Sequence, residues 1–490
     1  MRLETISRPC RLLFLTLACV APAHGEMSLQ EYQRLVRSKN YSFIGSDQQK
    51  VGAEGRKREA DLVFSPAFFS AAQAKSDKKT QVMPGVPNIV NYSELDTENY
   101  SAGVSQAFRT GTKARLYYSL DHYNYRYSSQ PDFAYYEGSP VLELTQPLWQ
   151  NAKGAADRAG EESARAQADS EVWSAEHELR GLLAKAERAY WSLAVARELV
   201  SVRAKAQDEA QAVYDYLEKR TKMNLSDKSD LLQATASLGT ARLNLRTARY
   251  DEASAERAFR ACANMAADEV VPELTPLDWE KVRDIPEPGG MLEGRADVKA
   301  AEASSRATAA DARGQAEKDK PALDLKVSYA LNGRDSDFRA GTADSFGWSK
   351  PTMLAGLSFS IPFDYAAAKA AGAGALKKEK AAALLYQQKL LDQESERRDL
   401  VAKLGDARER LLLSYAIEEA QRVKMEHEKS RLKEGRTTTY QVLTFEQDYT
   451  NAQYGRVSAA AEVLATMADL KLYVRSDAPG PRSATAPERE

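Results

Sequence analysis

The chain has 490 residues, of which 43% are hydrophobic, so it is long enough for one large core or for two to three ordinary domains. Its formal net charge is −2, and charges of both signs are interspersed along the sequence, which argues against a nucleic-acid partner. Cys10 and Cys19 lie in the N-terminal leader described next, which leaves only Cys262 and excludes an intramolecular disulfide.

The first 25 residues have the layout of a cleavable secretory signal. Three arginines precede an apolar run over residues 12–21, and small residues lead to Gly25. We therefore expect residues 1–25 to be removed, so that the mature chain starts near Glu26. A competing interpretation makes Cys19 a lipidation site, but residues 16–18 before it fit a lipoprotein signal poorly. Elsewhere no apolar stretch approaches the roughly 20 residues that a transmembrane helix needs.

After a predicted helix over residues 28–60, the hydrophobic period changes from that of a helix to that of strands. The segment after Pro66 alternates aromatic and small residues. The three segments predicted to be strands come after it: 99–109, 114–127 and 138–148. The first two are joined by a turn at Gly111–Lys113. Nine of the 23 tyrosines fall in this stretch, as expected where strands meet a membrane interface: Tyr92, Tyr100, Tyr117, Tyr118, Tyr123, Tyr125, Tyr127, Tyr135 and Tyr136. The alternative is a soluble antiparallel sheet with an aromatic face.

Residues 152–220 contain no proline and are predicted to form one helix of roughly 100 Å, far longer than a globular helix. Apolar residues recur in it at alternating steps of three and four, which predicts a coiled-coil seam: Leu179, Leu182, Ala186, Ala189, Leu193, Ala196 and Val200. Segment 222–228 interrupts the pattern, and Ser226 or Asp227 is suited to cap a new helix. A second seam follows, so the two arms form an antiparallel hairpin: Leu231, Ala234, Leu238, Ala241, Leu245, Ala248 and Ala255.

Segment 268–290 contains four prolines and two adjacent glycines, which predicts a connector between two structural repeats, 26–267 and 291–475. The second repeat is predicted to contain the following elements: a helix over 291–319, strands over 323–331 and 353–363, a long helix from about 366 to 433 and a helix over 440–473. Residues 476–490 lack a periodic apolar face, and we expect them to be disordered.

The second repeat matches the first, which indicates an internal duplication. Each strand region ends in a similar segment, LTQPL at Leu144–Leu148 and FSIPF at Phe359–Phe363, and the second proline follows the first by 215 residues. The two tips are 211 residues apart, so the helical arms have nearly equal lengths. The first repeat is about 40 residues longer in its strand region, which starts at Pro66 and at Pro321 respectively. This excess forms either an extra hairpin or a large loop.

Each tip is followed by a similar helix start, Asn224–Ala234 in the first repeat and Lys433–Gln447 in the second. Together with the duplicated strand ends, these segments resemble the TolC family of outer-membrane channel-tunnels over nearly the whole mature chain. The resemblance implies an α+β fold that combines membrane β-barrel strands with a long antiparallel α-helical coiled-coil tunnel. It also implies a homotrimer in which each copy contributes four strands to a shared twelve-stranded barrel.

The function implied by the resemblance is that of an outer-membrane channel-tunnel in a tripartite efflux or type I secretion system. Such a protein is a passive exit duct across the periplasm and the outer membrane of a Gram-negative bacterium, and it works with a periplasmic adaptor protein and an inner-membrane transporter. The alternative is a soluble periplasmic coiled-coil adaptor or scaffold protein, which predicts one helical hairpin instead of two.

In the family, interactions near the helix tips hold the periplasmic end nearly shut. Asp230 occupies a position where the family often has an aspartate, whereas Gln441 and Thr444 stand where the family can carry acidic residues. We expect Asp227, Asp230, Arg436 and Gln441 to form or surround this constriction. The alternative is that they are solvated polar residues at helix starts, where aspartate is favoured in any case.

The tips themselves are the expected docking site for the adaptor protein. Their residues are Asn224, Leu225, Ser226, Gly435 and Thr437. Asn224 and Gly435 suit a left-handed or otherwise tight backbone turn.

No catalytic constellation is present in the sequence. His122, His177 and His427 lack the paired spacing of a zinc motif, and we expect each to be a structural or surface residue. There is also no Walker A loop and no dinucleotide-binding glycine fingerprint. We therefore expect no enzymatic activity, no cofactor and no bound metal.

Overall fold

The computed structural model describes residues 26–78, 81–82, 90–127, 131–224, 227–276, 282, 294–434 and 436–473. The predicted signal, the predicted tail and most of the second part of the predicted connector lie outside these residues. The chain divides into two compact units. The tip unit falls within residues 1–41, 183–286 and 404–468, and the sheet unit falls within residues 42–182, 287–403 and 469–490.

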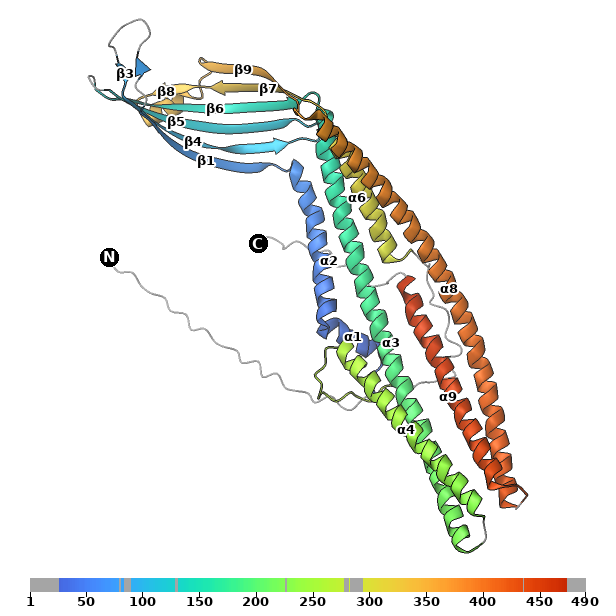
Figure 1. Cartoon of the computed structure of the whole chain (residues 1–490). Helices are drawn as coiled ribbons and strands as arrows, with labels where there is room; N and C mark the ends of the chain where they lie inside the picture. Colours follow the sequence, from blue (N-terminus) through green and yellow to red (C-terminus); the bar gives the residue numbers. More distant parts are fainter. Residues whose placement is uncertain are drawn as a thin grey trace, which may run out of the picture. The chain divides into compact units, whose positions relative to one another are not determined.

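The sheet unit contains one large antiparallel sheet with strands from both halves of the chain. Its strands are β1 (Ala67–Asp77), β4 (Glu94–Ala107), β5 (Lys113–Arg126), β6 (Phe133–Pro147), β7 (Ala322–Leu331) and β9 (Pro351–Ser360), which neighbour one another in this order (Figure 1). The short β8 (Gly333–Asp335) pairs with β6. A separate small sheet pairs β2 (Gln81–Val82) with β3 (Val90–Tyr92).

The strands expected from the sequence are confirmed, with two corrections. The segment after Pro66 forms a full strand, β1, and the predicted strand 353–363 ends at Ser360 because Pro362 has no backbone N–H to continue the ladder. The expectation of four strands per copy is wrong for this chain, since the main sheet runs through six. The excess residues of the first half form a second hairpin, β4–β5, and not a large loop.

The register gives the sheet one apolar face and one polar face, because directly paired residues project to the same side. One row on the apolar face crosses all six strands: Phe68, Val104, Leu116, Leu142, Tyr329 and Met353. Phe68, Leu116 and Met353 are 74%, 61% and 76% exposed in the single chain. On the polar face, Glu143 lies 3.9 Å from Arg115 and 3.4 Å from Lys326.

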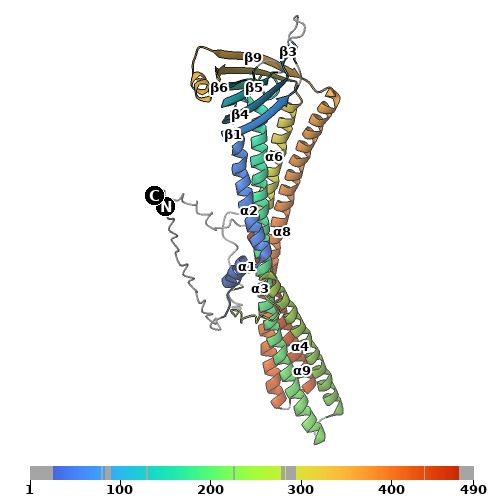
Figure 2. The same cartoon turned by 90° about the vertical axis from the view of Figure 1, so that its left-hand side faces the viewer.

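Four helices of the sheet unit lead away from one end of the sheet (Figures 1 and 2). They are α2 (Tyr41–Glu59), α6 (Ala296–Lys318) and the N-terminal parts of α3 (Ala155–Lys222) and α8 (Tyr365–Lys433). α2 is joined to α3 by an ion pair between Lys50 and Glu176, with a distance of 2.9 Å between nitrogen and oxygen. The Ser170 hydroxyl of α3 donates to the Ala300 carbonyl of α6 over 2.9 Å, a close approach that the buried alanines of both helices permit. Short elements complete the unit: η1 (Ala60–Phe64), η2 (Ala152–Gly154), α7 (Phe338–Asp344) and η3 (Lys471–Tyr473).

The tip unit contains α1 (Leu29–Lys39), α4 (Lys228–Cys262), α9 (Thr439–Leu470) and the C-terminal parts of α3 and α8. α1 begins at Ser28, whose hydroxyl accepts from the Glu31 amide while the Glu31 carboxylate accepts from the Ser28 amide. It packs into a core with α3 and α4, in which Tyr32 stacks on Phe259 at 4.0 Å between ring centroids. The single helix expected over 28–60 is divided into α1 and α2 at Asn40. The Asn40 side-chain amide donates to the Cys262 carbonyl.

The two helical hairpins, α3–α4 and α8–α9, confirm the predicted duplication of the helical arms. α3 and α8 have 68 and 69 residues, and α4 and α9 have 35 and 32. Most predicted seam residues are buried, among them Leu179, Ala186, Leu193, Leu238 and Leu245. Among the described residues, none of the helices is both long enough and apolar enough to cross a membrane.

Candidate constriction at the helix tips

The first tip connects α3 to α4 and contains a left-handed residue, as the sequence suggested. Asn224 has φ 60°, a conformation that asparagine tolerates better than most residues. Asp227 is the N-cap of α4, and its carboxylate accepts from the Ser229 amide over 3.1 Å. Asp230 follows in the first turn of α4 and is partly buried. Leu225 and Ser226 lie outside the described residues.

The second tip connects α8 to α9. The Arg436 side chain is 75% exposed, and one of its nitrogens lies 3.1 Å from the Glu434 carboxylate. The Thr437 hydroxyl bonds to Glu428 of α8 and lies 3.4 Å from the side-chain oxygen of Gln441. The Glu428 pKa is lowered, mainly by the hydrogen bond from Thr437. Gly435 lies outside the described residues.

The structure brings Thr437 and Gln441 together, and it pairs Arg436 within its own tip. Asp227 is likewise engaged in capping its own helix. Asp227 therefore acts as an N-cap and Arg436 forms a surface ion pair. Both are local roles of the kind that the sequence analysis gave as the alternative to a constriction. A constriction formed by these residues in an assembly remains a prediction.

A partly buried ionic cluster lies above the tips, where α3, α4, α8 and α9 pack together. The Lys429 ammonium on α8 lies 2.9 Å from the Glu446 carboxylate on α9 and 3.3 Å from the Glu209 carboxylate on α3. Glu446 is only 9% exposed, and burial raises its pKa despite the attraction of Lys429. Burial also disfavours the charged form of Lys429, but its bonds to Glu446 and Glu209 outweigh that effect and raise its pKa. The cluster therefore ties three helices together by charge.

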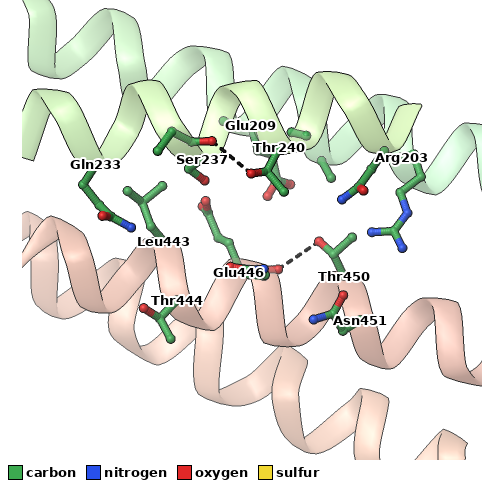
Figure 3. Close-up of a pocket in the computed structure, with 16 residues that line it drawn as sticks. Arg203, Glu209, Gln233, Ser237, Thr240, Leu443, Thr444, Glu446, Thr450 and Asn451 are labelled. Atoms are coloured by element: carbon green, nitrogen blue, oxygen red, sulfur yellow. Dashed lines mark hydrogen bonds between the residues drawn. The ribbon is translucent and has the colours of Figure 1, made fainter. Parts of the chain in front are cut away.

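Glu446 and Glu209 face a polar cavity of about 170 Å³ between α3, α4 and α9 (Figure 3). Its wall contains side-chain amides and hydroxyls from the two helices that follow the tips: Gln233, Ser237, Thr240, Asn244, Thr444 and Asn451. Alanines of α3 and α4 form another part of the wall and leave room that larger side chains would fill. The sequence reasoning placed Thr444 near the entrance but missed Lys429, Glu209 and Glu446. Each of the three is a charged residue at an inward-facing position of a coiled coil. Residue spacing alone does not distinguish such a position from one on a solvent-exposed helix face.

The raised pKa of Glu446 gives a testable pH dependence. The folded protein keeps the proton on Glu446 up to a higher pH than the unfolded chain does. The protonated carboxyl group therefore contributes its full stabilisation of the fold below the ordinary glutamate pKa, and this stabilisation is lost as the pH rises through the pKa of Glu446 in the folded protein. We expect the melting temperature of Glu446→Gln minus that of the wild type to increase as the pH rises above the ordinary glutamate pKa. Glu434→Gln, at a half-exposed site in the second tip, is the control, and its difference should change little. A flat profile for Glu446→Gln would contradict the assignment.

The three histidines lie in different surroundings. The His177 Nδ1 atom lies 3.9 Å from an Asp297 oxygen, and burial lowers the His177 pKa. His122 stacks on Tyr136, and His427 is exposed. Over the residues that the structure describes, no group of three or more histidine, cysteine, aspartate or glutamate side chains is arranged to hold a metal ion.

No protein-family model matches the sequence, and no curated protein matches it either. The structure is nevertheless similar to solved outer-membrane channels. OprN matches with a TM-score of 0.65 and 18% identity over 91% of this chain and 89% of that chain, and CusC matches with 0.63 and 12% over 91% and 92%. The open state of MtrE from Neisseria gonorrhoeae matches with 0.62 and 15% over 91% and 88%. These similarities confirm the expected α+β fold and, at the level of the fold, the resemblance to TolC-family channels.

Proposed function

We propose that this chain, which has the fold of the outer-membrane channels OprN, CusC and MtrE, is the outer-membrane channel-tunnel of a tripartite efflux or type I secretion system. Its sheet spans the outer membrane of a Gram-negative bacterium and its long helices extend into the periplasm. The protein is a passive exit duct and not an enzyme. Transport energy is supplied by an inner-membrane transporter.

The observation that carries this proposal is the apolar row that crosses every strand of the main sheet. A soluble protein rarely leaves such a band of large apolar side chains uncovered, whereas the outer surface of a membrane barrel requires it. The opposite face carries charged residues such as Arg115, Glu143 and Lys326, which suit a water-filled lumen. The alternative of a soluble adaptor or scaffold protein does not account for a sheet with one exposed apolar face and one polar face.

The open edges of the sheet support a proposal for the assembly. An open sheet edge is not tolerated in lipid, so the sheet must be completed by other copies, and we propose a homotrimer. The tips at Asn224 and Thr437 are the proposed docking site for a periplasmic adaptor protein. The two helical hairpins favour this arrangement over the adaptor alternative, which needs only one.

Purification of the full chain from membranes tests the proposal. We expect outer-membrane fractionation, a trimer that dissociates on heating and ion conductance in a planar lipid bilayer. A monomer in the soluble fraction, or a membrane protein that never conducts, would exclude a channel.

A variant of the tips tests the predicted constriction separately. Asp230→Ala combined with Arg436→Ala is expected to raise single-channel conductance several-fold, because it removes charges from both tips that are proposed to hold the entrance nearly shut. Arg398→Ala is the matched control, since Arg398 is 74% exposed and pairs with Glu394 of its own helix in the sheet unit. If the tip variant and the control both retain the closed state, Asp230 and Arg436 are not gate residues.

A further inference from the structure

The second hairpin of the main sheet is an addition to the four-strand plan. β1 follows α2 and η1, and β6 leads into α3; in the second half, β7 follows α6 and β9 leads into α8. These four strands occupy equivalent places in the two repeats. β4 and β5 have no counterpart in the second repeat, and they lie between β1 and β6 in the sheet.

The added hairpin is fully paired on both sides. β4 pairs with β1 from Ala67↔Ser105 to Asp77↔Leu95, which is the whole length of β1. β5 pairs with β6 from Lys113↔Thr145 to Tyr125↔Phe133. The hairpin therefore forms part of the sheet wall, and β1 reaches β6 only through it.

The turn of this hairpin is also anchored to the start of α3. Gly111 and Gly154 both have positive φ, and a Cβ on Gly111 would lie 2.8 Å from the Gly154 nitrogen. Arg109 next to the turn reaches the Glu161 carboxylate of α3 over 2.6 Å, and the Glu161 side chain is only 7% exposed. The Thr112 hydroxyl bonds to Gln146 at the end of β6. This close backbone contact fixes the hairpin in the sheet unit.

The two outer strands of the sheet present unpaired edges. Among the described residues, β1 pairs only with β4, and β9 pairs only with β7. The two strands have 11 and 10 residues. Because six successive strands alternate in direction, β9 of one copy and β1 of the next are antiparallel, and Met353 and Phe68 extend the same apolar row up to both edges. Two neighbouring copies of this chain, one at each edge, therefore satisfy both edges without a break in the apolar surface.

We infer that three copies, in the channel proposed above on which this inference rests, close a barrel of eighteen strands, six from each copy, in place of the twelve that the family resemblance implies. Strands about 4.8 Å apart and tilted by about 40° give a diameter of about 36 Å between backbones for eighteen strands and about 24 Å for twelve. Barrels of this larger size leave an open aqueous channel. The polar face, with Arg115, Glu143 and Lys326, lines that channel.

The larger barrel diameter affects which solutes can pass through the outer membrane. A barrel of this width does not by itself limit transport through the outer membrane to small molecules. Selection by size then falls to the helical section of each trimer.

The direct test is an electron cryo-microscopy map of the full chain in lipid nanodiscs, in which the strands are counted. We expect eighteen. A conducting trimer with twelve strands would overturn this inference and leave the proposed function intact, whereas a chain that does not insert into membranes would overturn the proposed function itself.

A disulfide test in native membranes checks the same point without a map. In a Cys262→Ser background, Ala72→Cys with Tyr100→Cys places thiols on directly paired residues of β1 and β4. Oxidation is expected to protect both thiols from a maleimide polymer that is added after the membranes have been denatured in detergent. Ala72→Cys with Gly138→Cys, which lies on the same row but two strands further away on β6, is the control and should remain labelled. The reverse result would show that β1 pairs with β6 and that the hairpin is expelled from the barrel.

Discussion

Replacing Phe259 with alanine is expected to destabilise the core of the tip unit by about 3–5 kcal/mol, the range for truncating a buried phenylalanine. Phe259 is fully buried, its ring stacks on Tyr32, and its carbonyl accepts from the Tyr32 hydroxyl over 2.8 Å. The neighbouring Tyr190 donates to the Met27 carbonyl over 2.9 Å, so the same cluster ties the start of the described chain to α3. Loss of the ring leaves a cavity at the point where α1, α3 and α4 meet.

Hydrogen exchange of the α1 and α4 amides is the measurement for this change. A loss of 3–5 kcal/mol corresponds to a fall in protection of more than about 100-fold, since about 1.4 kcal/mol is one factor of ten. Tyr250→Ala on the same helix is the control, because Tyr250 is 69% exposed in the single chain and its loss opens no internal cavity there. Equal losses of protection in the two variants would show that the Tyr32–Phe259 core does not hold α1 in place.

Replacing Gly154 with alanine is expected to have the second large effect, at the contact between the β4–β5 turn and α3. Gly154 has φ 69°, which costs other residues about 1–2 kcal/mol, and its new Cβ would lie 2.7 Å from the Gly111 nitrogen. Forcing the two backbones apart adds about 1–3 kcal/mol. We expect the temperature at which the proposed trimer loses its folded electrophoretic form to fall by several degrees.

Gly160→Ala is the control for this experiment, and its expected effect on the melting temperature has the opposite sign. Gly160 lies one to two turns further along α3, has nothing within 4 Å of its Cβ position and has a helical backbone. Alanine there favours the helix by up to about 1 kcal/mol, so its melting temperature should stay the same or rise. A Gly154 variant as stable as the Gly160 variant would mean that the turn does not press on α3.

The outcome for the predicted constriction shows where sequence reasoning reaches its limit. Asn224 was expected to adopt a left-handed conformation from its residue type, and it does. The interaction of Arg436 with Glu434 and the burial of Glu446 depend on which side chains other helices bring nearby, and no local pattern encodes that.

The sequence by itself determined the helical arms, their duplication and the existence of the strands, because hydrophobic periods of 3.6 and 2 are properties of neighbouring residues. Only the tertiary structure decided that the extra residues of the first half form a hairpin between β1 and β6, and that Lys429 lies between Glu209 and Glu446. Both are contacts between segments far apart in the chain, and their free energy depends on partners, register and burial that exist only after the chain has folded.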